Sequence, residues 1–426
     1  MMPAVTSAVS LPAGGDDFVR STSPTFTSRC SRFILLLCKL KKLYTLLELF
    51  DMIISRKGGF YMSLKSIIKA FFSTTLASAV SILLCACSGQ ADTSSSSTVV
   101  QDTTASKIEA VSREHRKIII DTDTGADDAS ALILAAKQKN VEILGVTVLV
   151  GNVDLEQSTK NALSALEQAG CDAPVYKGSA DTVDGTVKTA FCVFGTDGMG
   201  DADLIHPKKQ AEDGDAIDFI IETVKNNPGE VEIIAIGPAT NIAKAIQKAP
   251  DDMKKVKRIW SMGTAGLGPG NASPVAEFNV YADAKAYKIM LDSGLPITVV
   301  GLDMCDGKAM WTDNQFVELE NTNDTGKFVA SSFGKIREFY KSNGSEDVMN
   351  CDALAMMCAL YPEFIKSTVN THASCVTEDG ETYSQVIFYK EGFTYDAVKN
   401  DFDNNVVLVT EADKAVYFKN YLEAIR

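Results

Sequence analysis

Residues 117–132, KIIIDTDTGADDASAL, join an apolar run to a stretch of small and acidic residues. The isoleucines at 118–120 are β-branched and uninterrupted by charge, which is typical of a central parallel strand covered on both faces. Residues 126–137 then have the small and apolar composition of a helix. A buried strand that runs directly into a helix predicts an α/β fold.

Four carboxylates lie at this junction, and they belong to Asp121, Asp123, Asp127 and Asp128. They crowd the carboxyl end of the predicted strand, where open α/β sheets bind ligands. Like charges at this spacing repel one another, so a hard cation, bound protons or helix N-terminal amides must relieve the repulsion. Of these three remedies we favour a cation.

Segments typical of strands and helices alternate along the rest of the chain. Further strands are predicted at residues 141–151, 231–237, 257–263 and 297–303. Further helices are predicted at residues 155–169, 216–226, 282–293, 328–340, 353–360 and 411–424. This order predicts one domain over residues 113–426, with a doubly wound, mostly parallel central sheet and helices on both faces. Residues 182–203 are glycine-rich and polar, which indicates a functional loop.

The first part of the chain is typical of a secretion signal rather than of a folded domain. Residues 62–69 are basic, residues 70–84 are apolar or small, and LCAC at residues 84–87 resembles a bacterial lipobox. We therefore predict a lipoprotein signal peptide at residues 62–86, lipidation at Cys87 and a Ser/Thr-rich tether at residues 87–112. The alternative is a transmembrane anchor, but the apolar run is shorter than the roughly 20 residues of a span.

Residues 1–61 do not belong to a lipoprotein precursor, because a signal peptide begins at the N-terminus. Lys57-Gly-Gly can be encoded by a purine-rich ribosome-binding sequence just upstream of Met62. We therefore expect translation to start at Met62 and residues 1–61 to be a non-native upstream extension. The alternative is a cytoplasmic extension with an amphipathic segment at residues 33–54. The expected location is the outer side of the bacterial cytoplasmic membrane, through a lipid anchor.

Charge and cysteine content exclude several classes of protein. The chain has a net charge of −14, and residues 1–86 hold ten basic and four acidic residues, so the remainder has a net charge of −20. Such an acidic chain argues against a nucleic-acid partner and is compatible with a cation and a small neutral substrate. The cysteines after Cys87 match no zinc-binding spacing, and buried free thiols are expected for most of them.

Five segments in chain order carry a family resemblance: DTDTGADDASAL at residues 121–132, VGN at 150–152, GPATN at 237–241, NASPVAEFN at 271–279, and Asp352. Together they resemble the inosine-uridine preferring nucleoside hydrolase family. The resemblance implies the nucleoside hydrolase fold and hydrolysis of the N-glycosidic bond of a small nucleoside to ribose and free base. It also implies a homo-oligomer, since related enzymes form dimers or tetramers.

The resemblance also implies a role for each matching residue. It implies that Ca²⁺ is bound by Asp123, Asp128, Asp352 and the carbonyl of Ile236, and that Asp123 is the base that activates a calcium-bound water. The implied substrate-binding residues are Asp127, Asn152, Met262, Asn271, Glu277, Phe278 and Asn279. Each asparagine taken singly fits a turn or a helix cap better, but together with the acidic motif they favour a sugar-binding site.

The side of the pocket that would hold the base departs from the family. Cys351 stands where members often have a histidine proposed to protonate the leaving base, and Phe194 replaces a second histidine of the pocket loop. A neutral thiol is a poor acid. Tyr340 is a further candidate to contact the base, although core packing explains it equally well. Thr124 also replaces a proline of the family motif, without removing a ligand.

Three alternatives stay open at this point. A phosphatase of the haloacid dehalogenase type also begins with strand-Asp-x-Asp, but it favours threonine or a branched apolar residue where this chain has Gly125. A nucleoside-binding lipoprotein without turnover shares the anchor and the tether. A degenerate, purely structural member of the family is the third alternative.

Overall fold

The structure is a computed structural model that describes residues 115–389 and 402–426. The predicted extension at residues 1–61, the signal peptide, Cys87 and the tether lie outside the described residues. None of the helices within the described ranges is long and apolar enough to cross a membrane.

A nine-stranded sheet forms the centre of the domain, in the order β4-β3-β2-β1-β5-β6-β7-β11-β8. Neighbouring strands run parallel except for β8, which is antiparallel to β11. The strands are β1 (Arg116–Thr122), β2 (Val141–Val148), β3 (Val175–Lys177), β4 (Glu212–Asp215), β5 (Val231–Ala235), β6 (Arg258–Met262), β7 (Ile297–Val300), β8 (Ile365–Thr371) and β11 (Val406–Ala412). A separate hairpin pairs β9 (Ala373–Cys375) with β10 (Val386–Phe388).

Alternate residues of β1 feed two separate hydrophobic cores, which explains its unbroken apolar run. Ile118 and Ile120 belong to one core, whereas Ile119 belongs to the other. The first core contains residues from α3 (Ala126–Ala136), α4 (Leu155–Ala169), α11 (Asp313–Glu320), α12 (Asp324–Ser332), α13 (Gly334–Ser342), α14 (Cys351–Leu360) and α15 (Tyr417–Ile425). The second contains residues from α6 (Ala216–Asn226), α7 (Thr240–Lys248), α8 (Pro250–Met253), α9 (Phe278–Ala282) and α10 (Ala284–Leu291). Helices on both faces confirm the predicted doubly wound fold.

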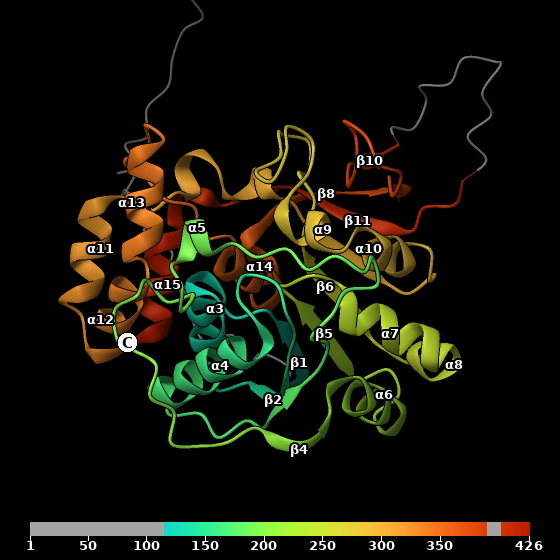
Figure 1. Cartoon of the computed structure of the whole chain (residues 1–426), viewed down its shortest axis with the longest axis horizontal. Coiled ribbons are helices and arrows are strands. Elements are labelled where there is room, and N and C mark those ends of the chain that lie inside the picture. Colours follow the sequence, from blue (N-terminus) through green and yellow to red (C-terminus); the bar gives the residue numbers. More distant parts are fainter. Residues whose placement is uncertain (1–114, 390–401) are drawn as a thin grey trace, which may run out of the picture. The chain divides into compact units, whose positions relative to one another are not determined.

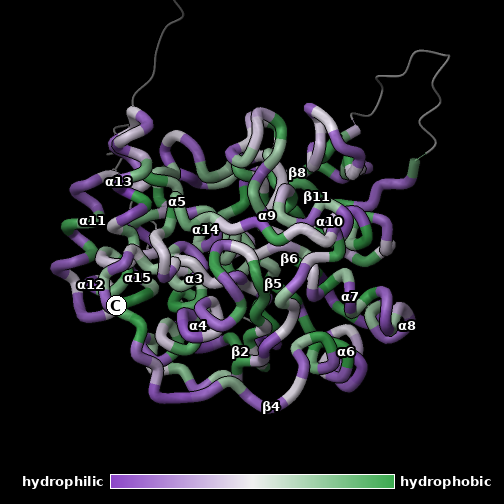
Figure 2. Tube along the Cα trace, viewed as in Figure 1, coloured by the Kyte–Doolittle hydropathy of each residue, from purple (hydrophilic) through white to green (hydrophobic). Residues whose placement is uncertain are grey.

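The two groups of helices are visible in the arrangement of the domain. α11, α12, α13 and α15 gather at one end of the view, and α6, α7 and α8 lie at the other (Figure 1). The strands β2, β5 and β6 run through hydrophobic stretches, while the outer turns near β4 and α8 are hydrophilic (Figure 2). This distribution is the one that buried parallel strands require, because both of their faces are covered.

The order in which strands are added to the sheet changes side at β1. The segment after β1 builds the sheet on one side through β2, and β5 then pairs with the other edge of β1. The carboxyl ends of these strands lie together, since Thr122 is paired with Val148 and Asp121 with Ala235. A ligand site is expected at such a switch point.

Two of the predicted helices have the wrong bounds. The helix predicted at residues 328–340 is broken, because α12 ends at Ser332 and α13 begins at Gly334. Gly334 is a weak helix former. The loop around Gly200 also packs closely on this junction, since a Cβ added at Gly200 would lie 2.7 Å from the Ser332 carbonyl oxygen.

The helix predicted at residues 411–424 begins only at Tyr417. Residues up to Ala412 extend β11, where Glu411 and Ala412 pair with β8. α15 then packs on the first core, and two of its tyrosine hydroxyls are used. Tyr421 donates to the Ser130 carbonyl of α3 (3.2 Å), and Tyr417 donates to the Asn350 carbonyl ahead of α14 (2.9 Å).

Candidate active site

A cavity of about 150 Å³ lies beside the carboxyl ends of the central strands. All the residues that were predicted to contact ribose or base line it, together with Asp352. They are Asp127, Asn152, Phe194, Met262, Asn271, Glu277, Phe278, Asn279, Tyr340 and Cys351. Asp123, Asp128 and Ile236 are not among the lining residues, but each is hydrogen-bonded to one of them: Asn152 bonds to both aspartates, and Asn279 bonds to the Ile236 carbonyl.

Some lining residues were missed by the sequence reasoning, namely Ala190, Val193, Ala272, Ile336, Phe339 and Met349. The sequence did contain a pattern that could have identified two of them. Ile336, Phe339 and Tyr340 have the i, i+3, i+4 spacing that places side chains on one helix face, here the face of α13. Four-residue α5 (Phe191–Phe194) gave no such pattern, because it lies within the glycine-rich loop.

Three carboxylates converge at the N-termini of two helices. Asp127, Asp128 and Asp352 each offer one oxygen, and these oxygens lie within 4.8 Å of one another. Asp127 and Asp128 are in the first turn of α3, and Asp352 is in the first turn of α14. Both helix dipoles favour negative charge here. Burial still raises the pKa of Asp127 to about 8, and burial and the neighbouring carboxylates raise the pKa of Asp352 well above its usual value.

Asp128 is held in place by three donors. It accepts hydrogen bonds from Thr122 Oγ1 (2.6 Å), the Gly125 N–H (2.9 Å) and Asn152 Nδ2 (3.0 Å). Burial raises its pKa to about 6, although these hydrogen bonds favour the ionised form and lower it. Its orientation is therefore fixed by β1, the turn into α3 and the end of β2.

Asp123 is fully buried between two glycines. Its Oδ2 accepts the Asn152 N–H at 2.6 Å, and its Oδ1 has no hydrogen-bond partner. A Cβ added at Gly151 would lie 2.1 Å from Oδ2, and one added at Gly237 would lie 2.7 Å from Oδ1. Burial and the charge of Asp128 raise the pKa of Asp123 well above its usual value. Only glycines on both sides leave room for this carboxylate.

Asp121, near the end of β1, holds neighbouring elements of the site together. It accepts hydrogen bonds from Thr147 Oγ1 (2.5 Å) and Asn241 Nδ2 (2.9 Å). Burial raises its pKa to about 6. Because its partners come from β2 and α7, Asp121 joins the elements on either side of β1 and does not line the cavity.

The opposite wall is built by α9 and the loop before it. Glu277 caps this helix by accepting the N–H groups of Asn279 (2.9 Å) and Val280 (3.3 Å), and burial raises its pKa to about 7. Asn279 Nδ2 donates to the carbonyls of Ile236 (3.0 Å) and Met262 (3.3 Å).

Asn271, in the loop before α9, is exposed and accepts the Phe278 N–H at 2.9 Å. This wall therefore presents one carboxylate and two amides to the cavity.

The donor set fits a hard divalent cation. Asp123 and Asp127 each have a buried carboxylate oxygen without a hydrogen-bond partner. Among residues 115–389 and 402–426, no lysine or arginine forms an ion pair with Asp123, Asp127, Asp128 or Asp352. Several buried carboxylates without a basic partner require protons or a metal ion, and oxygen donors of this kind suit calcium or magnesium.

The remaining wall is aromatic and apolar, with two neutral polar groups. Burial raises the pKa of the Tyr340 hydroxyl, and the pKa of the Cys351 thiol is raised by its hydrogen bond with Cys305 and by burial. Both groups are therefore protonated at neutral pH.

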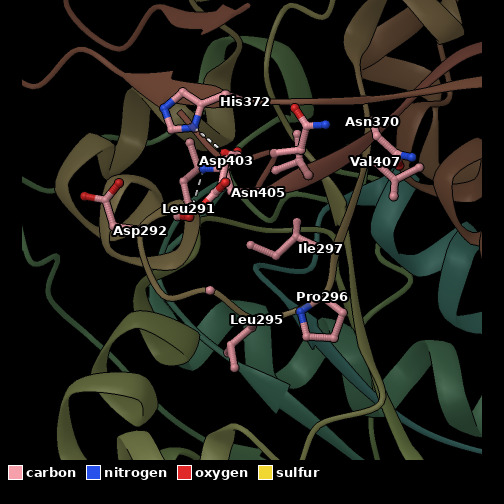
Figure 3. A pocket seen from close by; sticks show the side chains of 13 residues that line it. Leu291, Asp292, Leu295, Pro296, Ile297, Asn370, His372, Asp403, Asn405 and Val407 are labelled. Carbon is pink, nitrogen blue, oxygen red and sulfur yellow. Dashed lines mark hydrogen bonds between the residues drawn. The ribbon is translucent and has the colours of Figure 1, made fainter. Parts of the chain in front are cut away.

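None of the residues that line the cavity is a histidine. His372 lies at another hollow, of about 820 Å³, where its Nδ1 is 3.0 Å from the Asp403 carbonyl oxygen (Figure 3). That hollow is at the amino ends of β7 and β11, the edge of the sheet opposite the candidate site.

The arrangement agrees with the comparison to known families. The family model described as inosine-uridine preferring nucleoside hydrolase matches residues 118–419. This chain belongs to that family. Nucleoside hydrolases are enzymes, and this one is a ribonucleoside hydrolase. Membership favours hydrolysis over the phosphatase and over a binding protein without turnover.

Individual relatives of this nucleoside hydrolase agree in sequence and in fold. It is 37% identical to uridine nucleosidase 1 of Arabidopsis thaliana over 254 residues, which are 59% of this chain and 75% of that protein. It is 36% identical to the probable uridine nucleosidase 1 of Oryza sativa subsp. japonica over 255 residues, 59% of this chain and 78% of that protein.

Solved structures show the same fold. A plant nucleoside hydrolase, the PpNRh1 enzyme, has a TM-score of 0.69 at 29% identity and covers 73% of this chain and 99% of its own. A purine-preferring ribonucleoside hydrolase from Gardnerella vaginalis has a TM-score of 0.66 at 28% identity, with coverage of 73% and 98%.

Proposed function

We propose that this enzyme hydrolyses ribonucleosides with Asp123 as the base that takes the proton of the attacking water, at a site that binds Ca²⁺. The observation that carries the proposal is a group of buried carboxylates, which have no basic partner within the described part of the chain, beside a cavity lined in part by amides. Asp123, Asp128, Asp352 and the Ile236 carbonyl are the proposed calcium ligands, and Asp127 lies close enough to join them. Calcium, when bound, supplies Lewis acidity and takes six to eight oxygen ligands, which leaves positions for water and the ribose hydroxyls.

The residues of the chain supply the rest of the chemistry. Asp123 has one oxygen fixed by the Asn152 N–H and one that has no hydrogen-bond partner among the described residues, so one oxygen is oriented and the other is free to accept the proton of water. Asn271, Glu277 and Asn279 offer donors and acceptors for the ribose hydroxyls. Cleavage of the glycosidic bond develops positive charge on the ribose, and the surrounding carboxylates stabilise that charge.

The neutral groups on the nucleobase side of the cavity restrict which nucleobases can leave. The Tyr340 hydroxyl and the Cys351 thiol can donate hydrogen bonds but are poor acids. A base whose departing charge is shared by carbonyl oxygens, such as uracil or hypoxanthine, therefore suits the pocket better than one with an amino group, such as adenine. Relatives named as uridine nucleosidases support the same preference.

The deciding experiment is a panel of nucleosides assayed for free ribose in the presence of calcium. We expect ribose from uridine and inosine, less from cytidine and adenosine, and none from Asp123→Ala. Tight nucleoside binding without ribose release by the wild type would favour a binding protein. Phosphate release from a nucleotide that persists in Glu277→Ala would favour a phosphatase.

We also propose that the mature enzyme is exported and anchored through lipid at Cys87. The support is the basic, apolar and LCAC order of residues 62–87. Cys87→Ser should lose the lipid and be released from the membrane fraction, and a Cys87→Ser variant that still carried lipid would contradict the anchor. The start of translation at Met62 and the homo-oligomer stay predictions.

A further inference from the structure

The loop at residues 182–190 leads directly into the base-side wall of the cavity. Ala190 lines the cavity and donates its N–H to the Asn152 carbonyl at 3.0 Å. α5 follows at once and places Val193 and Phe194 in the same lining. The position of this loop therefore sets the position of the wall.

The start of the loop is tied to α10 through Asp283, the N-cap residue of that helix. Its carboxylate accepts the N–H groups of Val183 (2.7 Å) and Asp184 (3.1 Å). It also accepts Thr240 Oγ1 (2.7 Å) and the Ala286 N–H (3.2 Å). Asp283 is fully buried, so this anchor holds the start of the loop rigidly.

Lys188 ties the middle of the loop to α9. Its ammonium donates to the carbonyl of Ala282 at 3.5 Å, where the helix ends and a cation is favoured. It also lies over the rings of Tyr281 and Tyr383, 5.0 and 5.3 Å from their centroids. The two rings pack edge to face at 5.7 Å, and the lysine side chain is only 19% exposed.

Tyr383 comes from the segment between β9 and β10 and completes this cluster. Its hydroxyl donates to the Asp184 carboxylate and accepts from Lys188 Nζ at 3.4 Å. Asp184 also pairs with Lys188 (3.9 Å) and with Lys285 (3.2 Å). The adjacent Ser384 has φ +67°, a conformation that non-glycine residues keep only where the surroundings fix it. We call Asp184, Lys188, Tyr281 and Tyr383 the lysine latch.

We propose that Lys188 and Tyr383 are positioning residues that set the gap between the ribose side and the base side of the substrate cavity. The inference rests on the proposed function, in which α9 carries ribose-binding residues and the loop at 182–190 leads to the base-side wall. A hollow of about 980 Å³ borders the latch, so a released loop has room to move outward. Loss of the latch should weaken binding of a whole nucleoside and leave the binding of free ribose unchanged.

The test compares Lys188→Met with the wild type in the calcium-loaded enzyme. We expect KM for uridine to rise by about tenfold, the scale of one lost, partly buried cation–π contact, while kcat changes little. The inhibition constant of free ribose should stay within about twofold of the wild type, because ribose does not contact the wall. Lys188→Arg should restore KM, since it keeps a cation between the rings.

Lys285→Met is the matched control. It also removes a lysine from Asp184, but it leaves both rings and the tie to α9 in place, and the Lys285 side chain is 52% exposed. Its KM should stay near the wild-type value, and Tyr383→Phe, which loses only the hydroxyl, should fall between the two.

Two outcomes would overturn the proposal: an unchanged KM in Lys188→Met, or a ribose inhibition constant that rises in step with KM. If the wild type released no ribose, the proposed function would fail separately, and calorimetric dissociation constants for uridine and ribose would give the same comparison of variants.

Discussion

The aspartates between β1 and α3 differ in their partners although they are close in sequence. Asp121 accepts side-chain donors from β2 and α7 at its Oδ1, Asp128 accepts three donors, and Asp123 accepts only the Asn152 N–H at its Oδ2. Among the described residues, the second oxygens of Asp121 and Asp123 have no hydrogen-bond partner. Asp127 joins Asp128 and Asp352 in the tight carboxylate group, whereas the family resemblance placed Asp127 on the ribose and Asp123 among the ligands. Sequence spacing alone could not separate these roles, since they depend on which way each side chain turns.

This difference predicts unequal effects of the same change. Asp123→Asn should lower kcat by at least 100-fold, because an amide cannot accept the proton of water. Asp121→Asn should stay within about tenfold of the wild type, because an amide oxygen can still accept from Thr147 and Asn241. Steady-state kinetics on uridine measure both, and equal losses would show that Asp123 acts only as a structural residue.

The thiol of Cys351 gives a second prediction at this scale. Because burial and Cys305 keep it protonated, it should contribute to binding of the base and not to proton transfer. Cys351→Ala should therefore lower kcat on uridine by no more than about tenfold, well below the loss expected for removing a general acid. A thousandfold loss with an altered pH profile would assign the thiol a catalytic role.

At the scale of elements, β1, β2 and the helices after them were predictable because their signals are local: apolar, β-branched runs for the strands, and small or amphipathic composition for the helices. The break between α12 and α13 was not, since apolar residues continue across it and, besides Gly334, the loop around Gly200 packs against it from a distant part of the sequence. The tail was misjudged for a similar reason. Residues 411 and 412 are strand rather than helix because they extend β11 and pair with β8, a contact that no local pattern contains.

Two glycine substitutions test the close packing of the site against ordinary helix propensity. Gly151→Ala places a Cβ 2.1 Å from Asp123 Oδ2, so it should displace that carboxylate and lower kcat by about 100-fold. Gly334→Ala, at the first position of α13, meets nothing closer than 3.9 Å and should stabilise the protein by about 0.5–1 kcal/mol. Kinetics and thermal unfolding distinguish the two, and full activity in Gly151→Ala would contradict the packing argument.

For the molecule as a whole, the buried carboxylates link stability to pH and to calcium. Their pKa values are raised in the folded protein, to about 8 for Asp127 and about 6 for Asp128, from 3.8 for an ordinary aspartate. Between pH 3.8 and about 8 the folded state therefore binds more protons than the unfolded state. The free energy of unfolding of the calcium-free protein should fall as pH rises through this range.

Added calcium should reverse this loss, because it replaces the protons as the partner of the carboxylates. The increase in Tm caused by calcium should be larger at pH 8 than at pH 5, measured by calorimetry against a chelator control. Asp352→Asn should reduce the increase at both pH values. An equal increase at both pH values in the wild type would show that calcium binds elsewhere.

The tyrosines of α15 tie the end of the chain to α3 and to the residue before α14. The active site therefore depends both on α3, which is synthesised early, and on α15, which is synthesised almost 300 residues later. A chain still emerging from the ribosome should therefore lack a firmly held α3 and α14, and with them a formed cavity, until α15 is in place.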